Sequence, residues 1–259
     1  MSRKTVYYHD PLHDDFAPTN GRIHPKQIGA DFPYEHKGPL WNALAFVVYR
    51  MVMTPFLFLY CKLVFGLRIE NRKALRALPG GYFLYGNHTN TLLSFPRRAN
   101  IITSADTVSI LGVRNIVQML GAIPLANTIE GTRQFLAAMH RRLERGQAVM
   151  IYPEAHIWPY YNGIRPFPDT SFAYPVREQL PAVAAAVVYR QRKLLRALPP
   201  RITVVVSDPF YPDPALPPRS ARRDLHEKVY TFLCDTVSAR RSYAHIEYLP
   251  AQDQNPAAR

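Results

Sequence analysis

The sequence predicts a single α/β domain with a mostly parallel central sheet flanked by helices, joined to an N-terminal apolar helical segment that associates with a membrane. Short apolar runs rich in Val, Ile, Ala and Tyr predict the strands, because strands buried on both faces read as continuous hydrophobic runs. A chain of 259 residues at 47% hydrophobic content can bury a substantial core. The strand-like runs lie at residues 82–85, 101–106, 149–151, 182–189 and 202–206.

Composition divides the chain into three parts. Residues 1–40 are rich in proline, aspartate and histidine, which predicts an irregular extension. Residues 41–68 are apolar and predict membrane-associating helices, and residues 69–250 contain all the strand-like runs. Within this third part, apolar residues at helical spacing predict a helix over 127–146, and a closing helix is expected over 224–237.

The apolar segment 43–67 is long enough to interact with a bilayer, but Arg50, Pro55 and Lys62 interrupt it. A straight helix across the membrane would place a charged side chain at a costly depth unless that side chain snorkels. The segment therefore predicts two helices, broken near Pro55, that lie in the membrane interface. The alternative is a pair of helices buried in a soluble core.

The net charge of +13 lies entirely beyond the N-terminal extension, since residues 1–40 hold five basic and five acidic residues. A basic surface can serve nucleic acid or anionic lipid, and the chain carries no nucleic-acid-binding motif. Together with the apolar segment, this charge predicts an anionic membrane surface as partner and no nucleic acid. The two cysteines, Cys61 and Cys234, suggest no disulfide framework, so the cytoplasmic face of the cell membrane is expected.

Polar groups follow two of the predicted strands. Asn87-His88 follows the run at 82–85, after Gly86, and Pro153-Glu154 follows the run at 149–151. Reactive groups gather beyond the carboxyl ends of strands in open α/β sheets. The two strand exits are therefore expected to face each other across one crevice.

These motifs resemble those of the glycerolipid acyltransferase superfamily, the lysophosphatidic acid (1-acylglycerol-3-phosphate) acyltransferases in particular. That family carries Asn-His-x-x-x-x-Asp at one strand exit and Phe-Pro-Glu-Gly-Thr-Arg at another. Asn87-His88 matches the first motif and Tyr152-Pro153-Glu154 the second; blocks at 120–124 and 180–183 are similar to the family's middle and closing blocks. The run YPEAHIWPYY with IRPF is closest to a bacterial subgroup of the family.

The resemblance implies an acyltransferase domain over residues 69–250, which moves a fatty acyl group from acyl-CoA or acyl carrier protein to a lysophospholipid-type acceptor in phospholipid synthesis, without a cofactor or a metal. His88 is the expected general base, because an imidazole with a pKa near 6.5 is mostly neutral at pH 7. Glu154 is the second expected catalytic residue, and Arg165 is expected to hold an anionic head group. The full set of expected substrate-binding residues is Asn87, Thr89, Pro153, Ala155, His156, Trp158 and Arg165.

The sequence departs from the family pattern in two places. Leu93, followed by Ser94, stands where the family has the Asp that orients the histidine, and Ile157 stands where it has a phosphate-binding Arg. Arg165 is a candidate replacement for that Arg, and Asp106 is a candidate carboxylate from elsewhere. These departures leave open a degenerate, non-catalytic homologue that binds lipid. A metal hydrolase using the histidines and glutamate of the two motifs has no supporting motif.

Overall fold

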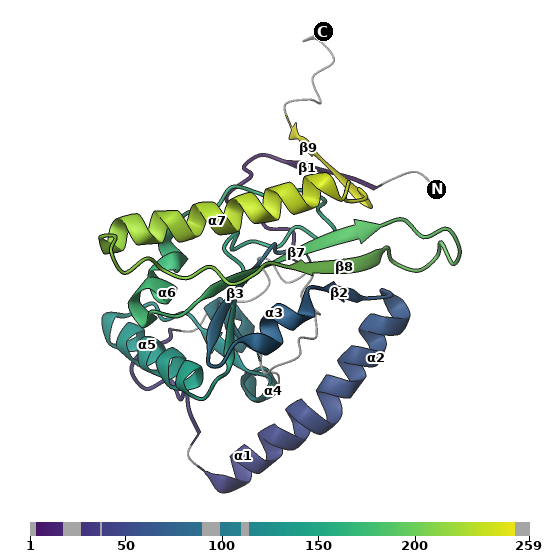
Figure 1. Cartoon of the computed structure of the whole chain (residues 1–259). Helices are drawn as coiled ribbons and strands as arrows, with labels where there is room; N and C mark the ends of the chain where they lie inside the picture. The colour runs from purple at the N-terminus through teal and green to yellow at the C-terminus, as the bar shows by residue number, and fades with distance from the viewer. Residues whose placement is uncertain (1–3, 18–26, 37, 90–98, 110–113, 252–259) are drawn as a thin grey trace.

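The computed structural model describes residues 4–17, 27–36, 38–89, 99–109 and 114–251, and its centre is a seven-stranded sheet (Figure 1). Every neighbouring pair in this sheet is parallel except β7–β8. In spatial order the strands are β2 (Arg68–Glu70), β8 (Arg201–Val206), β7 (Ala182–Arg190), β3 (Tyr82–Gly86), β6 (Ala148–Ile151), β4 (Ala99–Thr103) and β5 (Ala122–Pro124). The predicted mostly parallel sheet is confirmed.

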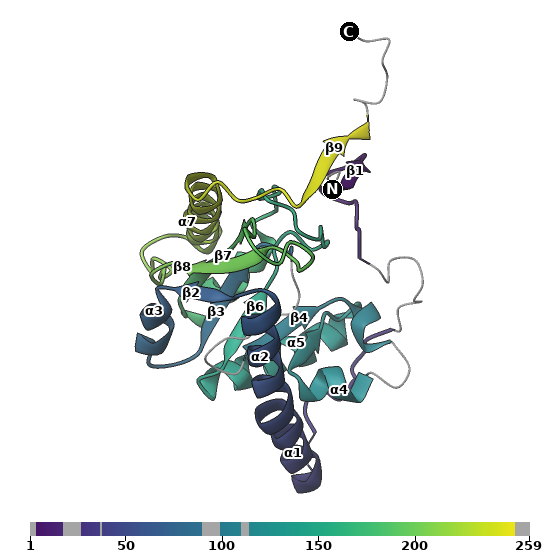
Figure 2. The ribbon, with the colours of Figure 1, turned by 90° about the vertical axis from the view of Figure 1, so that its right-hand side faces the viewer.

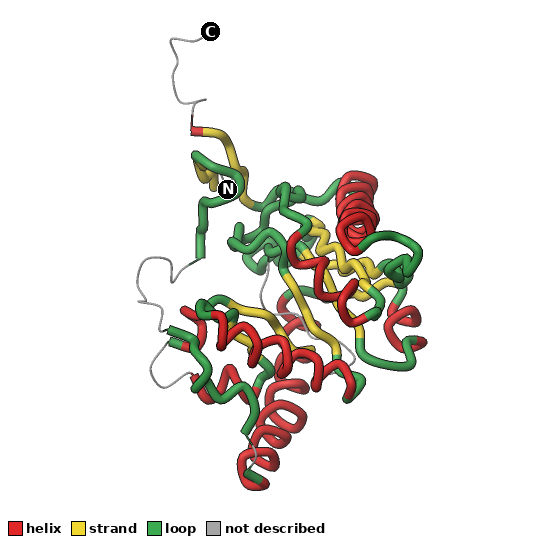
Figure 3. Tube along the Cα trace, turned by 90° about the vertical axis from the view of Figure 1, so that its left-hand side faces the viewer, coloured by secondary structure: helices red, strands yellow, loops and turns green. Residues whose placement is uncertain are grey.

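Helices cover both faces of the sheet, which explains why its central strands are apolar throughout. Successive side chains of a strand point to opposite faces, so Phe83 and Tyr85 join one core cluster, whereas Tyr82 and Leu84 join the other. The first cluster is closed by α5 (Ile129–Glu144), α6 (Ala173–Glu178) and α7 (Pro218–Ala239). The second is closed by α3 (Arg72–Ala77) and the end of α2 (Thr54–Val64). Figure 3 shows the strands enclosed between helices.

Two predicted elements have different bounds in the structure. Residues 101–106 were expected to be one strand, but β4 ends at Thr103 and a 3₁₀ turn, η2 (Ala105–Val108), follows. The closing helix begins at Pro218, six residues earlier than expected, because proline fits the first turn of a helix, where its missing N–H has no intrahelical partner. The helix expected over 127–146 is α5, capped by the Thr128 side chain.

The N-terminal extension is more ordered than its composition predicts. Lys4–Tyr8 forms β1, which pairs in parallel with β9 (Ile246–Pro250) as a separate two-stranded sheet. Figure 2 shows this small sheet beside the main body. The expectation of an irregular extension is wrong for these five residues, because their partner lies at the other end of the sequence and no local pattern indicates the pairing.

The expected break near Pro55 is absent, since α1 (Pro39–Phe46), a π-helical segment η1 (Val47–Met53) and α2 form one helix, Pro39–Val64. A proline within an α-helix clashes with the carbonyl four residues before it. Here the wider π turn precedes Pro55, and both the backbone N–H and the hydroxyl of Thr54 donate to the carbonyl of Tyr49. The helix therefore continues through the proline.

This 26-residue helix is long and apolar enough to cross a membrane by length and composition. Only 11% of its most apolar stretch is buried, so the alternative of a helical pair inside a soluble core does not describe it. Figure 1 shows the helix running along one side of the body, with α1 at its lower end. It is a candidate membrane-associating segment.

Candidate active site

The two polar strand exits are neighbours in space. Strands β3 and β6 pair directly, with Tyr85 opposite Ile151, so the loops after them leave the same edge of the sheet. The Glu154 carboxylate accepts a hydrogen bond from the backbone N–H of His88, at 3.1 Å. The sequence therefore identified correctly which two loops meet.

Among the described residues, the imidazole of His88 has one hydrogen-bond partner, and it lies at Nδ1. Its Nδ1 lies 3.0 Å from the carbonyl oxygen of Ala155. A carbonyl only accepts hydrogen bonds, so in the neutral ring Nδ1 carries the proton and Nε2 keeps its lone pair. The ring also stacks on Tyr152, with centroids 4.4 Å apart and planes 12° from parallel. This arrangement assigns one tautomer to His88, in which Nε2 is the nitrogen with the lone pair.

The Ala155 carbonyl is presented by a strained turn. Ala155 has a φ of 60°, a left-handed conformation that residues other than glycine rarely adopt. The turn is closed by two backbone hydrogen bonds, from Ala155 N–H to Tyr152 and from His156 N–H to Glu154. Such strained residues persist where their surroundings fix them, and they cluster at functional sites.

Burial lowers the pKa of His88 to about 4. The hydrogen bond to Ala155 and the charge of Asp15 oppose this shift, whereas the nearby Arg165 and His156 add to it. At pH 7 the ring is therefore neutral, and its Nε2 can accept a proton without first losing one.

Glu154 and Arg165 form a buried ion pair behind the histidine. Oε1 of Glu154 accepts the backbone N–H of Arg165 at 3.0 Å, and Oε2 lies 3.3 Å from the Arg165 Nη2. Burial raises the pKa of Glu154, and the Arg165 charge together with the backbone N–H groups of Arg165 and His88 opposes that rise. Both carboxylate oxygens are thus used within the chain.

Arg165 is enclosed by the protein and only 2% exposed. Its guanidinium donates to the carbonyls of Pro11, Glu154 and His156, and lies 4.9 Å from the ring of Trp158. A head group would have to displace these contacts to reach it. This placement argues against the direct head-group contact expected from the sequence.

Asn87 and Thr89 are also buried and bonded to the neighbouring strand. The Asn87 amide donates to the carbonyl of Val187 and accepts its N–H, at 3.2 and 2.8 Å. Thr89 accepts the Tyr189 hydroxyl, at 2.9 Å to its side chain and 3.1 Å to its carbonyl. In this geometry both residues fix the loop that carries His88, rather than presenting their side chains to a substrate.

Trp158 anchors the second loop to the small β1–β9 sheet. Its backbone N–H donates to the carbonyl of His88 at 3.1 Å, and its ring N–H donates to the carbonyl of Asp14 at 2.8 Å. The ring stacks on Tyr248 of β9 and lies 4.8 Å from Tyr8 of β1. Sequence reasoning missed this contribution of both chain ends. The aromatics and aspartates of residues 1–17 were its only local signal.

The other residues that the sequence singled out are not hydrogen-bonded to the His88 side chain in the described part of the chain. Pro153 is buried, and His156 faces Asp15, with 3.6 Å between Nδ1 and the carboxylate. Asp106 follows β4 and is not a hydrogen-bond partner of His88 in the described part of the chain. Leu93 and Ser94, at the position of the family's Asp, lie outside the described residues.

No group of three potential metal ligands occurs among the described residues, so the metal-hydrolase alternative gains no support.

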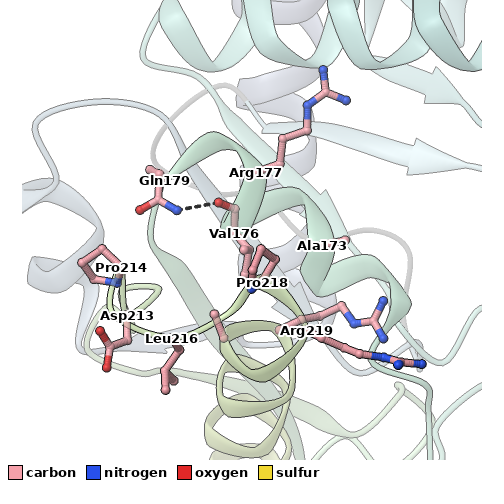
Figure 4. A pocket seen from close by; sticks show the side chains of 11 residues that line it. Ala173, Val176, Arg177, Gln179, Asp213, Pro214, Leu216, Pro218 and Arg219 are labelled. Carbon is pink, nitrogen blue, oxygen red and sulfur yellow. Dashed lines mark hydrogen bonds between the residues drawn. The ribbon is translucent and has the colours of Figure 1, made fainter.

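A cavity of about 580 Å³ lies away from these residues, between α6 and the start of α7 (Figure 4). It is lined by Val176, Arg177, Pro218 and Arg219, among others, and Gln179 donates to the Val176 carbonyl at its wall. Helix α6 precedes the start of β7, whereas Asn87 pairs with Val187 near the end of β7. The cavity and His88 therefore lie at opposite ends of the strands.

No protein-family model matches the sequence, and no curated protein matches it. The fold is similar to the crystal structure of the 1-acyl-sn-glycerophosphate (LPA) acyltransferase PlsC from Thermotoga maritima. The TM-score is 0.50 at 14% identity, and the match covers 79% of this chain and 97% of that one. At this identity the likeness shows the fold alone: this α/β chain is folded like a lysophosphatidic acid acyltransferase.

Proposed function

We propose that this protein is a membrane-associated acyltransferase that moves a fatty acyl group from acyl-CoA or acyl carrier protein to a 1-acylglycerol-3-phosphate or similar lysophospholipid. The observation that carries the proposal is the His88 ring on the fold of an LPA acyltransferase: it is held through Nδ1 at a strand exit, and no described residue bonds its Nε2. The four sequence motifs in family order support the same activity.

In the proposed reaction, Nε2 of His88 removes the proton of the acceptor hydroxyl as its oxygen attacks the thioester carbonyl carbon. The tetrahedral intermediate then expels the thiolate, which takes the proton back from the imidazolium and leaves as the free thiol. The products are the new ester and the thiol of the donor.

The Ala155 carbonyl takes the orienting role that a carboxylate has in related triads, because it accepts the Nδ1–H that remains on the protonated ring. A neutral carbonyl stabilises the imidazolium less than a carboxylate does. The turnover is therefore expected to be slower than that of relatives with the complete Asn-His-x-x-x-x-Asp motif.

Glu154 and Arg165 act as positioning residues in this proposal. The Glu154 carboxylate holds the backbone of His88, and Arg165 binds the carbonyls of Glu154 and His156, on either side of Ala155. The ion pair thus fixes both partners of the catalytic hydrogen bond.

The helix Pro39–Val64 is proposed to lie in the membrane interface. Its start is held by the stack of Trp41 on His36, its middle by a hydrogen bond from Ala99 N–H to the Tyr49 hydroxyl, and its end by the buried Cys61. A helix held to the body along its length cannot cross a bilayer without taking the body with it. Its outward surface is apolar: Leu40, Leu44, Phe46, Val47, Met51, Val52, Phe56, Phe58, Leu59 and Leu63 are exposed.

A second candidate is a degenerate homologue that binds lysophospholipid without turning it over. The observation that favours it is Leu93 at the position of the family's orienting Asp. An assay of the purified full-length protein separates the two, using labelled acyl-CoA and acyl carrier protein against a panel of lysophospholipids and glycerol phosphate. An acylated product from any of these acceptors supports the enzyme. Lysophospholipid binding with no product from any donor supports the second candidate.

The tautomer and pKa of His88 can be tested without any activity. Nitrogen NMR of protein labelled at its histidines should show His88 protonated at Nδ1, and neutral until the pH falls to about 4, because burial disfavours its charged form. Activity that depends on the neutral ring should therefore persist down to about pH 5.

His140 provides an internal contrast in the same spectra. Its hydrogen bond to Glu178 raises its pKa, so it should become charged at a higher pH than a free histidine. A His88 ring protonated at Nε2, or titrating near pH 6.5, would contradict the proposed arrangement.

A further inference from the structure

The tip of the β7–β8 hairpin is an exposed surface that the proposed reaction does not use. Leu194 and Leu195 are 83% and 71% exposed, and Leu198 is also exposed. Residues 190–201, RQRKLLRALPPR, hold five basic residues and no acidic one. Exposed leucines flanked by basic residues are typical of segments that bind an anionic membrane.

The hairpin tip is fastened to the end of the apolar helix. Arg192 is 8% exposed and donates to the carbonyl of Pro199 at 2.6 Å and to that of Val64, the last residue of α2. The backbone N–H of Ile202 donates to the carbonyl of Phe65 at 2.9 Å. In Figures 1 and 2, α2 and the end of the β7–β8 hairpin lie on the same side of the molecule. The hairpin tip therefore adjoins the end of the apolar helix.

We propose that this hairpin tip is a second membrane contact, which inserts Leu194 and Leu195 into an anionic bilayer while Arg190, Lys193 and Arg196 meet the lipid phosphates. The inference rests on the membrane association proposed above. A lipid surface fits better than a protein partner, because the basic charge is unbroken and the tip adjoins an apolar helix that has its own exposed face.

Two contacts fix how the body faces the membrane, and they turn the catalytic edge of the sheet toward it. Strands β3 and β7 are parallel, so their carboxyl ends lie at one edge. The Asn87 side chain pairs with Val187, three residues before the end of β7, so His88 and the hairpin share that edge. A lysophospholipid could then keep its acyl chain in the bilayer while its hydroxyl reaches His88.

Full-length protein with Leu195→Trp tests the contact directly, on phosphatidylglycerol–phosphatidylcholine vesicles that contain brominated lipid. After subtraction of the wild-type signal, the new tryptophan should be quenched by bromine in the acyl chains. The matched control is Ile129→Trp, since Ile129 is 78% exposed at the start of α5, whereas α1 lies beside Arg142 and Arg145 at the other end of α5. Its tryptophan should not be quenched.

Vesicle flotation provides the second measurement. The variant Leu194→Asp/Leu195→Asp should bind anionic vesicles about tenfold more weakly or worse, because burial of both leucines is lost and charge repulsion is added. Ile129→Asp should bind like the wild type. Normal vesicle binding by Leu195→Trp with its new tryptophan unquenched, together with unchanged binding of the double variant, would overturn the inference and leave the acyltransferase proposal intact. A quenched tip in a protein without turnover would uphold the inference and defeat the enzyme instead.

Discussion

Replacing Glu154 by alanine should lower the free energy of unfolding by about 3–5 kcal/mol, because it leaves the Arg165 guanidinium buried without its counter-charge. The carboxylate is almost fully buried and accepts hydrogen bonds from three N–H groups, two of them on the backbone of His88 and Arg165. The two backbone donors would lose their partner, and the guanidinium would keep only neutral carbonyl acceptors. Denaturant unfolding of wild type and variant measures the difference.

The matched control is Glu144→Ala, which removes a glutamate from an exposed pair with His140. Exposed ion pairs contribute little, so this change should have a much smaller effect than Glu154→Ala. The double variant Glu154→Gln/Arg165→Met removes both charges and should recover part of the loss. Equal, small effects of Glu154→Ala and Glu144→Ala would show that the buried pair does not hold the two loops together.

The sequence predicted the five inner strands of the sheet but not the short edge strands β2 and β5, because the signal of a buried strand is local. Four of the five strand-like runs became strands with nearly the expected bounds, since a strand buried on both faces must be apolar at every position. The meeting of His88 and Glu154 followed from the rule that the carboxyl ends of parallel strands share an edge. Both inferences needed only the residues of the segments themselves.

Three features could not be predicted from the sequence. They depend on residues far apart in the chain or on the conformation of the backbone. The β1–β9 pairing joins Lys4–Tyr8 to Ile246–Pro250, which no local pattern connects. The continuous helix through Pro55 depends on a shift to π-helical hydrogen bonds, which hydropathy does not reveal. The acceptor for His88 is a main-chain carbonyl, so its residue type, Ala155, carries no signal.

Arg165 is enclosed by the protein, whereas the sequence predicted that it would meet a head group. The sequence placed an arginine near the site and a phosphate-binding role was the natural interpretation, because Arg is the best residue for that purpose. Its burial against Glu154 and Trp158 depends on how two loops fold over each other. The loops leave its guanidinium inside the protein, bonded to Glu154 and to the carbonyl of His156.

Replacing His88 by alanine should reduce kcat by about 10²–10⁴-fold, because the variant has no group in place to remove the acceptor proton. The loss should fall on kcat rather than KM, since His88 is proposed to act on the hydroxyl during the reaction and not to bind the head group. Turnover of a short-chain acyl-CoA by wild type and variant at saturating acceptor measures it.

A loss of activity in this variant should not reflect unfolding, because the fold depends little on the imidazole. The backbone N–H of His88 still donates to Glu154 in the variant, and the lost side-chain bond to Ala155 is worth about 1 kcal/mol. Vesicle binding and the unfolding midpoint should therefore stay close to wild type.

His140→Ala, which removes an exposed histidine from α5, is the matched control and should retain full activity. Turnover that survives His88→Ala intact would remove His88 as the base and move the proton transfer to another group. A large loss in His88→Ala with normal folding, normal vesicle binding and an active His140→Ala would assign the proton transfer to the one ring nitrogen that the Ala155 carbonyl leaves free.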